Sequence, residues 1–210
     1  MTDLIEDIDP QIVRANLERV RAEAGEDVRI LVATKYVADE ELPALADAGV
    51  ELIGENRLQD LERKQALVGD RFEWHFIGAL QSRKVRDIVP RVSLIHSVCT
   101  DSVLAKLETH APPETEVLVQ VNVAGEQSKE GVAPHDLGDF IARCPATVTG
   151  LMTMPPFTED PEASRSHFAR LADLAREHSL PELSMGTSQD WRVAVEEGAT
   201  IIRLGTAVLR

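Results

Sequence analysis

Short apolar runs alternate with helical patterns along nearly the whole chain, and this alternation constrains the fold more than any other feature of the sequence. The apolar runs have the length of strands, and apolar residues recur at helical spacing between them. The predicted strands are 29–34, 50–54, 73–78, 93–98, 116–123, 147–152, 182–186 and 200–205. The predicted helices lie near 40–48, 57–68, 82–89, 101–109, 134–143, 161–178 and 189–197, with an additional helix near 10–24.

Eight strands that alternate with helices favour a parallel (β/α)8 TIM barrel, formed by a single domain over residues 1–210. A doubly wound open sheet has the same alternation of elements. That sheet, however, predicts a glycine-rich nucleotide-binding turn after the first strand, and the sequence there is ATKYVADEEL. We therefore expect the barrel, with the N-terminal helix as an extra element.

The charge of the chain excludes several classes of partner. The formal net charge is -14 at pH 7, which repels nucleic acid and anionic membranes. An anionic ligand would need a locally positive pocket. The acidic N-terminal segment does not resemble a signal peptide, no apolar stretch has membrane-spanning length, and the two cysteines form no disulfide or metal pattern. We expect a cytoplasmic protein.

Lys35 follows the apolar run at the end of the first predicted strand. A lysine in this position is unusual, because lysine is rarely buried unless it is paired or used chemically. Desolvation would lower its pKa and leave a neutral amine that can form a Schiff base with an aldehyde or ketone. Alternatively, Lys35 simply ends the strand and points to water.

The loops after the last two predicted strands have the composition of a phosphate site. Strand 182–186 leads through Thr187 and Ser188 into a helix, and hydroxyls and free N–H groups at a helix N-terminus bind phosphate. Gly205 and Thr206 offer a second set of N–H groups after the next strand. TIM barrels often bind phosphate with these two loops, although either feature alone could be an ordinary cap or turn.

Arg203 lies inside an otherwise apolar strand, where it shares a face with Ile201. A buried guanidinium needs an acceptor, which is either a core carboxylate or a ring nitrogen of a ligand. An imine-forming Lys35, a phosphate cup and Arg203 together describe pyridoxal 5'-phosphate (PLP). Asn56, which follows the second strand, could flank the cofactor ring or form a structural hydrogen bond.

The histidines give weaker signals. None has metal-ligand spacing, so we expect no metal site. His75 alternates away from Trp74 and Phe76, which indicates that it supports the barrel rather than reacts. His96 is expected near the rim, where nothing pairs it with a nucleophile.

Six segments resemble, in the same order, the pyridoxal phosphate homeostasis protein family, which is similar to the N-terminal barrel of bacterial alanine racemase. These segments are 32–35, 54–57, 74–78 with 80–82, 150–154, 184–188 with Asp190, and 203–206. The resemblance runs from about residue 10 to 209. Family members often have asparagine at the position of Arg83, so a role that depends on that amide is in doubt.

The resemblance implies a PLP site with no catalytic residue of its own. Lys35 would form the Schiff base, Arg203 would face the pyridine nitrogen, and Asn56 would lie beside the ring. The remaining residues would hold the phosphate, Met185 and Gly186 through their backbone. The implied cofactor-binding residues are Lys35, Asn56, Met185, Gly186, Ser188, Arg203, Gly205 and Thr206.

Members of this family are regarded as largely non-catalytic. The resemblance therefore implies a PLP carrier in vitamin B6 homeostasis, with PLP-dependent apo-enzymes as partners, and we expect a monomer. An amino-acid racemase needs a base on each face of the substrate, and alanine racemase takes one of them from a tyrosine in a separate domain. Here Tyr36 is expected to point away from Lys35.

Two other functions remain open. One is a PLP-dependent amino-acid racemase or decarboxylase whose second base is a rim residue such as His96 or comes from a partner subunit. The other is a cofactor-free Schiff-base aldolase that binds a sugar phosphate in the cup.

Overall fold

The computed structural model describes residues 4–125 and 130–210, so residues 1–3 and 126–129 of the predicted domain lie outside the described part. The strands are β1 (Arg29–Ala33), β2 (Leu52–Glu55), β3 (Glu73–Phe76), β4 (Leu94–Val98), β5 (Glu116–Gln120), β6 (Thr147–Met152), β7 (Glu182–Thr187) and β8 (Ile201–Leu204). The helices are α1 (Pro10–Ala24), α2 (Leu42–Asp47), α3 (Leu58–Val68), α4 (Val85–Ile88), α5 (Asp101–His110), α6 (Leu137–Ala142), α7 (Arg165–Glu177), α8 (Trp191–Glu196) and α9 (Thr206–Leu209).

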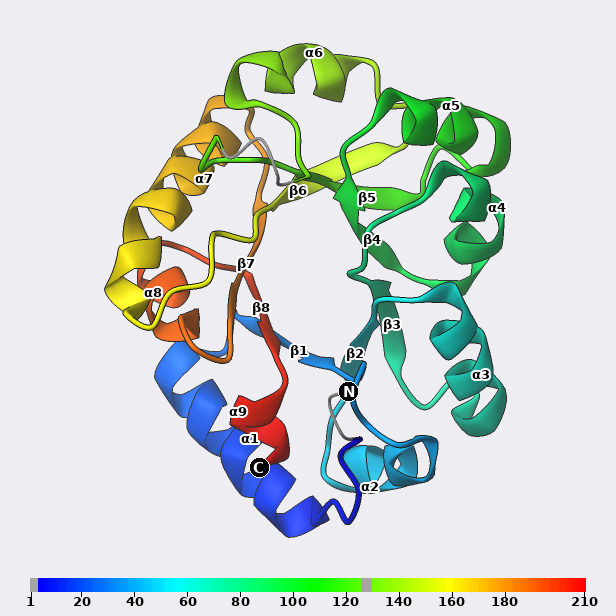
Figure 1. Cartoon of the computed structure of the whole chain (residues 1–210), viewed down its shortest axis with the longest axis vertical. Coiled ribbons are helices and arrows are strands. Elements are labelled where there is room, and N and C mark those ends of the chain that lie inside the picture. Colours follow the sequence, from blue (N-terminus) through cyan, green and yellow to red (C-terminus); the bar gives the residue numbers. More distant parts are fainter. Residues whose placement is uncertain (1–3, 126–129) are drawn as a thin grey trace.

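The eight strands form a closed parallel barrel in which each strand pairs with the next. β8 pairs with β1 from Arg29↔Ile201 to Val32↔Leu204, which closes the ring. The helices surround the strands on the outside, as Figure 1 shows in the view down the barrel. This closure confirms the predicted TIM barrel and rules out the doubly wound open sheet, which has two edge strands and does not close into a ring. No helix in the described ranges is long and apolar enough to cross a membrane.

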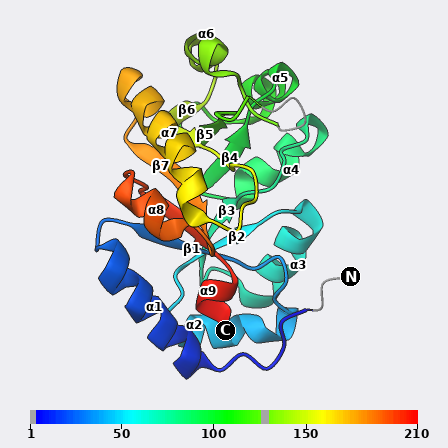
Figure 2. The same ribbon diagram turned by 60° about the vertical axis from the view of Figure 1, so that its left-hand side comes forward.

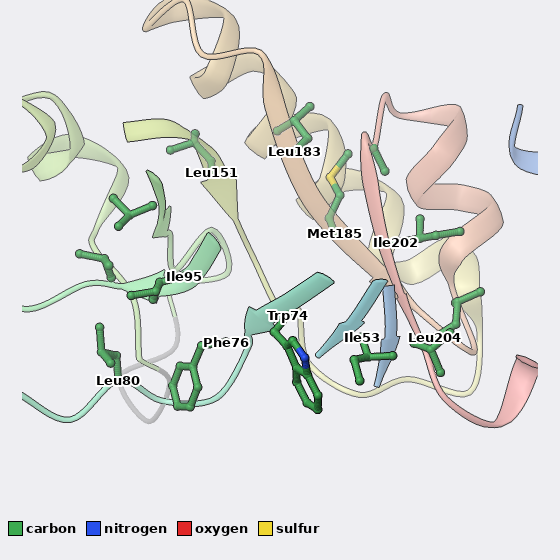
Figure 3. Packing of buried hydrophobic residues seen from close by; sticks show 14 of the residues in the cluster. Ile53, Trp74, Phe76, Leu80, Ile95, Leu151, Leu183, Met185, Ile202 and Leu204 are labelled. Atoms are coloured by element: carbon green, nitrogen blue, oxygen red, sulfur yellow. The ribbon is translucent and has the colours of Figure 1, made fainter. Parts of the chain in front are cut away.

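Side-chain alternation along the strands separates two apolar clusters. The larger cluster fills the space between strands and helices and includes Trp74 and Phe76 (Figure 3). The smaller one lies inside the barrel and consists of Leu31, Leu52, Leu94, Leu118, Met152 and Ile201. His75, between Trp74 and Phe76 in sequence, is 0% exposed and bonds to His96, in keeping with the prediction that it supports the barrel. Each fully buried leucine in these clusters stabilises the fold by roughly 1.5–3 kcal/mol relative to an exposed one.

The short helix α9 after β8 was not predicted, because its four residues are too few to show a helical period. It packs against α1 in both ribbon views (Figures 1 and 2). The side chain of Asn16 donates to the carbonyl oxygens of Val208 and Arg210, at 3.1 and 3.2 Å. These contacts anchor α9, which begins at the carboxyl end of the barrel, to the first helix.

Candidate functional site

A cavity of about 460 Å³ lies at the carboxyl end of the barrel, mainly between the loops that follow β1, β2, β7 and β8. It brings together six of the eight predicted site residues, namely Lys35, Asn56, Ser188, Arg203, Gly205 and Thr206. Ala33, Tyr36, Ile77, Met154, Thr187 and Gln189 complete its wall. Among the residues that the structure describes, this wall carries two cationic side chains and no acidic one, in a protein whose net charge is -14.

A second cavity lies at the opposite end of the barrel and differs in charge. There Arg21 and Arg29 are accompanied by Glu26, Glu51 and Glu73. Because these carboxylates offset the arginines, the cavity at the carboxyl end is better suited to an anion.

Lys35 is exposed in the turn that follows β1, which agrees with the alternative in which it ends the strand and points to water, and not with a desolvated lysine. The strand ends at Ala33, and a hydrogen bond of 2.9 Å from the Val37 amide to the Thr34 carbonyl closes the turn. The Lys35 ammonium nitrogen lies 4.3 Å from the centroid of the Tyr36 ring. Tyr36 also lines the cavity, which corrects the prediction that it points away from Lys35.

Ser188 connects the loops after β7 and β8. Its hydroxyl oxygen accepts from the backbone amides of Gly205 and Ala207, at 3.0 and 3.3 Å. The predicted helix after Ser188 begins only at Trp191, so Ser188 does not cap that helix. It bonds instead to the start of α9, which places its hydroxyl beside Gly205.

Asp190 closes the loop after β7. Its Oδ1 accepts from the amide and the hydroxyl of Thr187, at 2.7 and 3.0 Å, and its Oδ2 accepts from the hydroxyl of Ser164 at 3.0 Å. The sequence showed Asp190 only as part of a matching segment, whereas the structure shows that it shapes the rim.

Met185 and Gly186 are not part of the cavity wall. The Met185 side chain is 0% exposed and packs in the outer core (Figure 3). Gly186 has φ of 88°, and a Cβ there would lie 2.6 Å from the Cβ of Ala194 in α8. Glycine therefore lets α8 approach the strand closely. Backbone contacts from Met185 and Gly186 to a phosphate remain a prediction.

Arg203 provides a buried cation in the cavity wall. Only 5% of it is exposed, and it donates to Ser184 Oγ at 2.6 Å and to the Thr153 carbonyl oxygen at 2.9 Å. Both acceptors are neutral, so neither is the core carboxylate that was one of the two expectations. Burial lowers the pKa of Arg203 to about 10, and the nearby charge of Asp190 opposes that shift.

Asn56 is held at the cavity by a close backbone approach. A Cβ at Gly78 would lie 2.1 Å from the Asn56 carbonyl oxygen, so only glycine lets the two loops meet. Glu55, immediately before Asn56, points to the helix side, and one of its oxygens accepts from the Asn56 amide at 3.3 Å.

A buried ion pair supports the ends of β1 and β2, and sequence reasoning missed it. Lys64 in α3 donates to Glu55 Oε1 and to the Thr34 carbonyl oxygen, both at 2.6 Å, and the Thr34 hydroxyl donates to the same carboxylate oxygen at 2.6 Å. The side chains of Lys64 and Glu55 are 1% and 0% exposed. Lys64 shares a helix face with Leu61 and Val68, and this spacing was the signal available in the sequence.

His96 does not lie at the rim, which corrects its predicted position. It is 0% exposed and contacts His75 Nδ1 and Ser184 Oγ inside the barrel. Its burial also argues against the alternative in which His96 acts as a rim base toward a substrate.

Comparison with known proteins places this architecture in a family. Residues 8–209 match the model of the alanine racemase N-terminal domain. The pyridoxal phosphate homeostasis protein of Aquifex aeolicus is 40% identical over 90% of this chain and 92% of its own length. The Escherichia coli K12 protein of the same name is 30% identical over 87% and 85% of the two chains.

Solved structures agree with this assignment. PipY of Synechococcus elongatus, solved with and without PLP, superposes with a TM-score of 0.83 at 29% identity, over 94% of this chain and 100% of PipY. Alanine racemase of Corynebacterium glutamicum shares the fold, with a TM-score of 0.75 at 18% identity over 96% of this chain and 60% of the racemase. The chain belongs to the alanine racemase N-terminal domain family and, within it, to the pyridoxal phosphate homeostasis proteins.

Proposed function

We propose that this protein binds PLP in the cavity at the carboxyl end of the barrel and carries it, without strong turnover, in vitamin B6 homeostasis. The observation that carries the proposal is the cavity wall, which combines Lys35 and Arg203 with the hydroxyls of Ser188 and Thr206 and, over residues 4–125 and 130–210, contains no acidic side chain. An anionic ligand with an aldehyde and a ring nitrogen matches this set of groups. Supporting evidence is that relatives are named for pyridoxal phosphate homeostasis and that PipY was solved with PLP bound.

Each group has a distinct role in the proposed site. Bound PLP would supply a reactive aldehyde and a phosphate anion. Lys35 would provide the amine that condenses with the aldehyde to a Schiff base, with release of one water. Ser188, Gly205 and Thr206 would hold the phosphate, and Arg203 would donate a hydrogen bond to the pyridine nitrogen, beside which Asn56 lies.

The open mouth of the cavity supports a carrier rather than an enzyme. Lys35 is exposed, and so is Met154 on the cavity wall, with 53% of its surface accessible. Poor exclusion of water weakens control over reactive intermediates, whereas access to solvent favours exchange with PLP-dependent apo-enzymes. We further propose that residues 1–210 form one domain that acts as a cytoplasmic monomer.

The first experiment is the visible absorbance spectrum of the purified protein with PLP, before and after borohydride. We expect a Schiff-base band that borohydride fixes onto the peptide that contains Lys35. Lys35→Ala should abolish the band, whereas Lys106→Ala, an exposed lysine on α5, should leave it intact. A band that persists in Lys35→Ala would refute the assigned site, and a colourless wild-type protein would refute PLP binding.

One observation supports a second candidate, a PLP-dependent racemase. Tyr36 lines the cavity together with Lys35, so two groups that can transfer protons share one site. Amino-acid racemisation should be measured in the wild type and in Tyr36→Phe. Turnover on the order of 1–1000 per second that depends on Tyr36 would replace the carrier proposal.

A further inference from the structure

A chain of hydrogen bonds crosses the inside of the barrel and ends at Arg203. His75 Nε2 lies 2.9 Å from Glu73 Oε1, and His75 Nδ1 lies 2.9 Å from His96 Nε2. His96 Nδ1 lies 2.8 Å from Ser184 Oγ, to which Arg203 donates at 2.6 Å. Neither histidine belongs to the cavity wall, so the proposed function leaves both unexplained.

The Glu73 carboxylate, at one end of this hydrogen-bond chain, determines on which nitrogen of each histidine the proton lies. Glu73 Oε1 accepts from Arg29 at 2.9 Å and from the Ser93 hydroxyl at 2.7 Å, and its contact with His75 lowers the pKa of Glu73 to about 2. A carboxylate can only accept, so the proton of His75 must be on Nε2. Arg29 also lies 3.1 Å from His75 Nε2, but a guanidinium can only donate. Glu73 Oε1 is closer to this nitrogen and is the acceptor for its proton.

The remaining links then follow in a single direction. The Nδ1 of His75 is an acceptor, so His96 carries its proton on Nε2 and donates it there. The Nδ1 of His96 is therefore an acceptor for the Ser184 hydroxyl, whose oxygen accepts from Arg203. Every donor faces an acceptor from Arg203 to Glu73, and successive links of this kind polarise one another.

Burial keeps the two histidines in the middle of this hydrogen-bond chain neutral. His75, His96 and Ser184 are all 0% exposed. Desolvation lowers the pKa of His75 and, more strongly, that of His96. The titratable groups that act on the two imidazoles are Glu73, Arg29 and Glu116 for His75, and His75, Arg203 and Arg29 for His96.

We propose that His96 and Ser184 are positioning residues, which hold the Arg203 guanidinium in the orientation that meets the ring of bound PLP. This inference rests on the proposed function. Ser184 Oγ and the Thr153 carbonyl oxygen hold two different nitrogens of the guanidinium, so together they define its plane. Through His96 and His75, Glu73 at the opposite end of the barrel orients the hydroxyl of Ser184.

The first test uses the ligand-free wild type. Nitrogen-15 NMR of the histidine side chains should show both His75 and His96 as neutral rings protonated at Nε2, assigned with His75→Gln and His96→Asn. Protonation of His96 at Nδ1, or a cationic ring at neutral pH, would overturn the inferred direction of the chain. This measurement does not depend on whether PLP binds.

The second test measures PLP binding to His96→Leu, with His96→Asn as the conservative variant. Leucine removes both contacts, whereas the asparagine oxygen can take the place of Nδ1 and still accept from Ser184. We expect His96→Leu to weaken PLP binding about tenfold and to shift the nitrogen-15 signal of ring-labelled PLP, and we expect His96→Asn to restore most of both. Ser184→Ala should resemble His96→Leu.

Leu118→Ala is the structural control, because Leu118 is buried inside the same barrel but takes no part in the chain. It should lower the melting temperature without moving the PLP signal. If wild type binds PLP and His96→Leu gives the same affinity and ring-nitrogen shift, the positioning role is refuted while the proposed function stands. If wild type does not bind PLP, both are refuted.

Discussion

The buried ion pair between Lys64 and Glu55 gives the most direct test of how much the contacts at the ends of β1 and β2 stabilise the protein. Lys64→Met removes the cation and keeps most of the side-chain volume, which leaves the Glu55 carboxylate buried without its partner. At 2.6 Å the pair attracts by about 6 kcal/mol at an effective dielectric constant of about 20, and desolvation of both groups offsets much of this. Loss of one partner of a buried pair typically costs about 3–5 kcal/mol.

We expect a value near the lower end of that range for Lys64→Met. Glu55 keeps two other donors, the Thr34 hydroxyl at 2.6 Å and the Asn56 amide at 3.3 Å, and these stabilise the remaining charge. The expected loss in the free energy of unfolding is therefore about 3 kcal/mol. Urea unfolding followed by tryptophan fluorescence measures it, since Trp74 is buried in the outer core.

A double-mutant cycle separates the interaction within the pair from other effects of the substitution. Glu55→Gln with Lys64→Met replaces two charges by neutral groups of similar size, so this variant should be closer to wild type than Lys64→Met alone. If Lys64→Met costs less than about 1 kcal/mol, or if the double variant loses the full sum of the single losses, the reasoning is wrong.

Three further predictions follow from other contacts. The pKa of Glu73 is lowered from 4.5 to about 2, so its contribution to stability is present above pH 4.5 and is lost as the pH falls toward 2. Glu73→Gln should therefore flatten that part of an acid-unfolding curve. Burial lowers the pKa values of His75 and His96, so below pH 6.5 the unfolded chain binds more protons than the folded protein. The free energy of unfolding therefore falls on acidification. In His96→Leu this fall between pH 6.5 and 5 should be shallower, as the urea midpoints measured at each pH would show. Gly78→Ala places a Cβ 2.1 Å from the Asn56 carbonyl oxygen, so it should lower the free energy of unfolding by roughly 1–3 kcal/mol and weaken PLP binding. Unchanged affinity for PLP would show that this contact does not hold Asn56 in place.

Local patterns were sufficient to predict the barrel. Strand 147–152 coincides with β6, and the predicted helix near 10–24 coincides with α1. The alternation of Trp74, His75 and Phe76 correctly separated the outer core from the barrel interior. These features depend on spacing within one element, which the sequence displays directly.

Features that depend on loop conformation or on distant partners were harder to predict. Lys35 is exposed because the chain turns after Ala33, and the turn hydrogen bond between Val37 and Thr34 has no distinctive residue signature. The contact between His96 and Ser184 joins residues 88 positions apart. It forms only when the ring is closed, so no local pattern in either strand could indicate it.

The pairing of β8 with β1 has a consequence for the order of events in the cell. Lys35 and Asn56 follow β1 and β2, whereas Ser188, Arg203, Gly205 and Thr206 come from β8 and the loops after β7 and β8. A nascent chain therefore has no complete cavity until its final strand has left the ribosome. A ligand in this cavity would be acquired only after β8 has emerged, and it would then tie together the segments that follow β1 and β8 at the seam of the barrel.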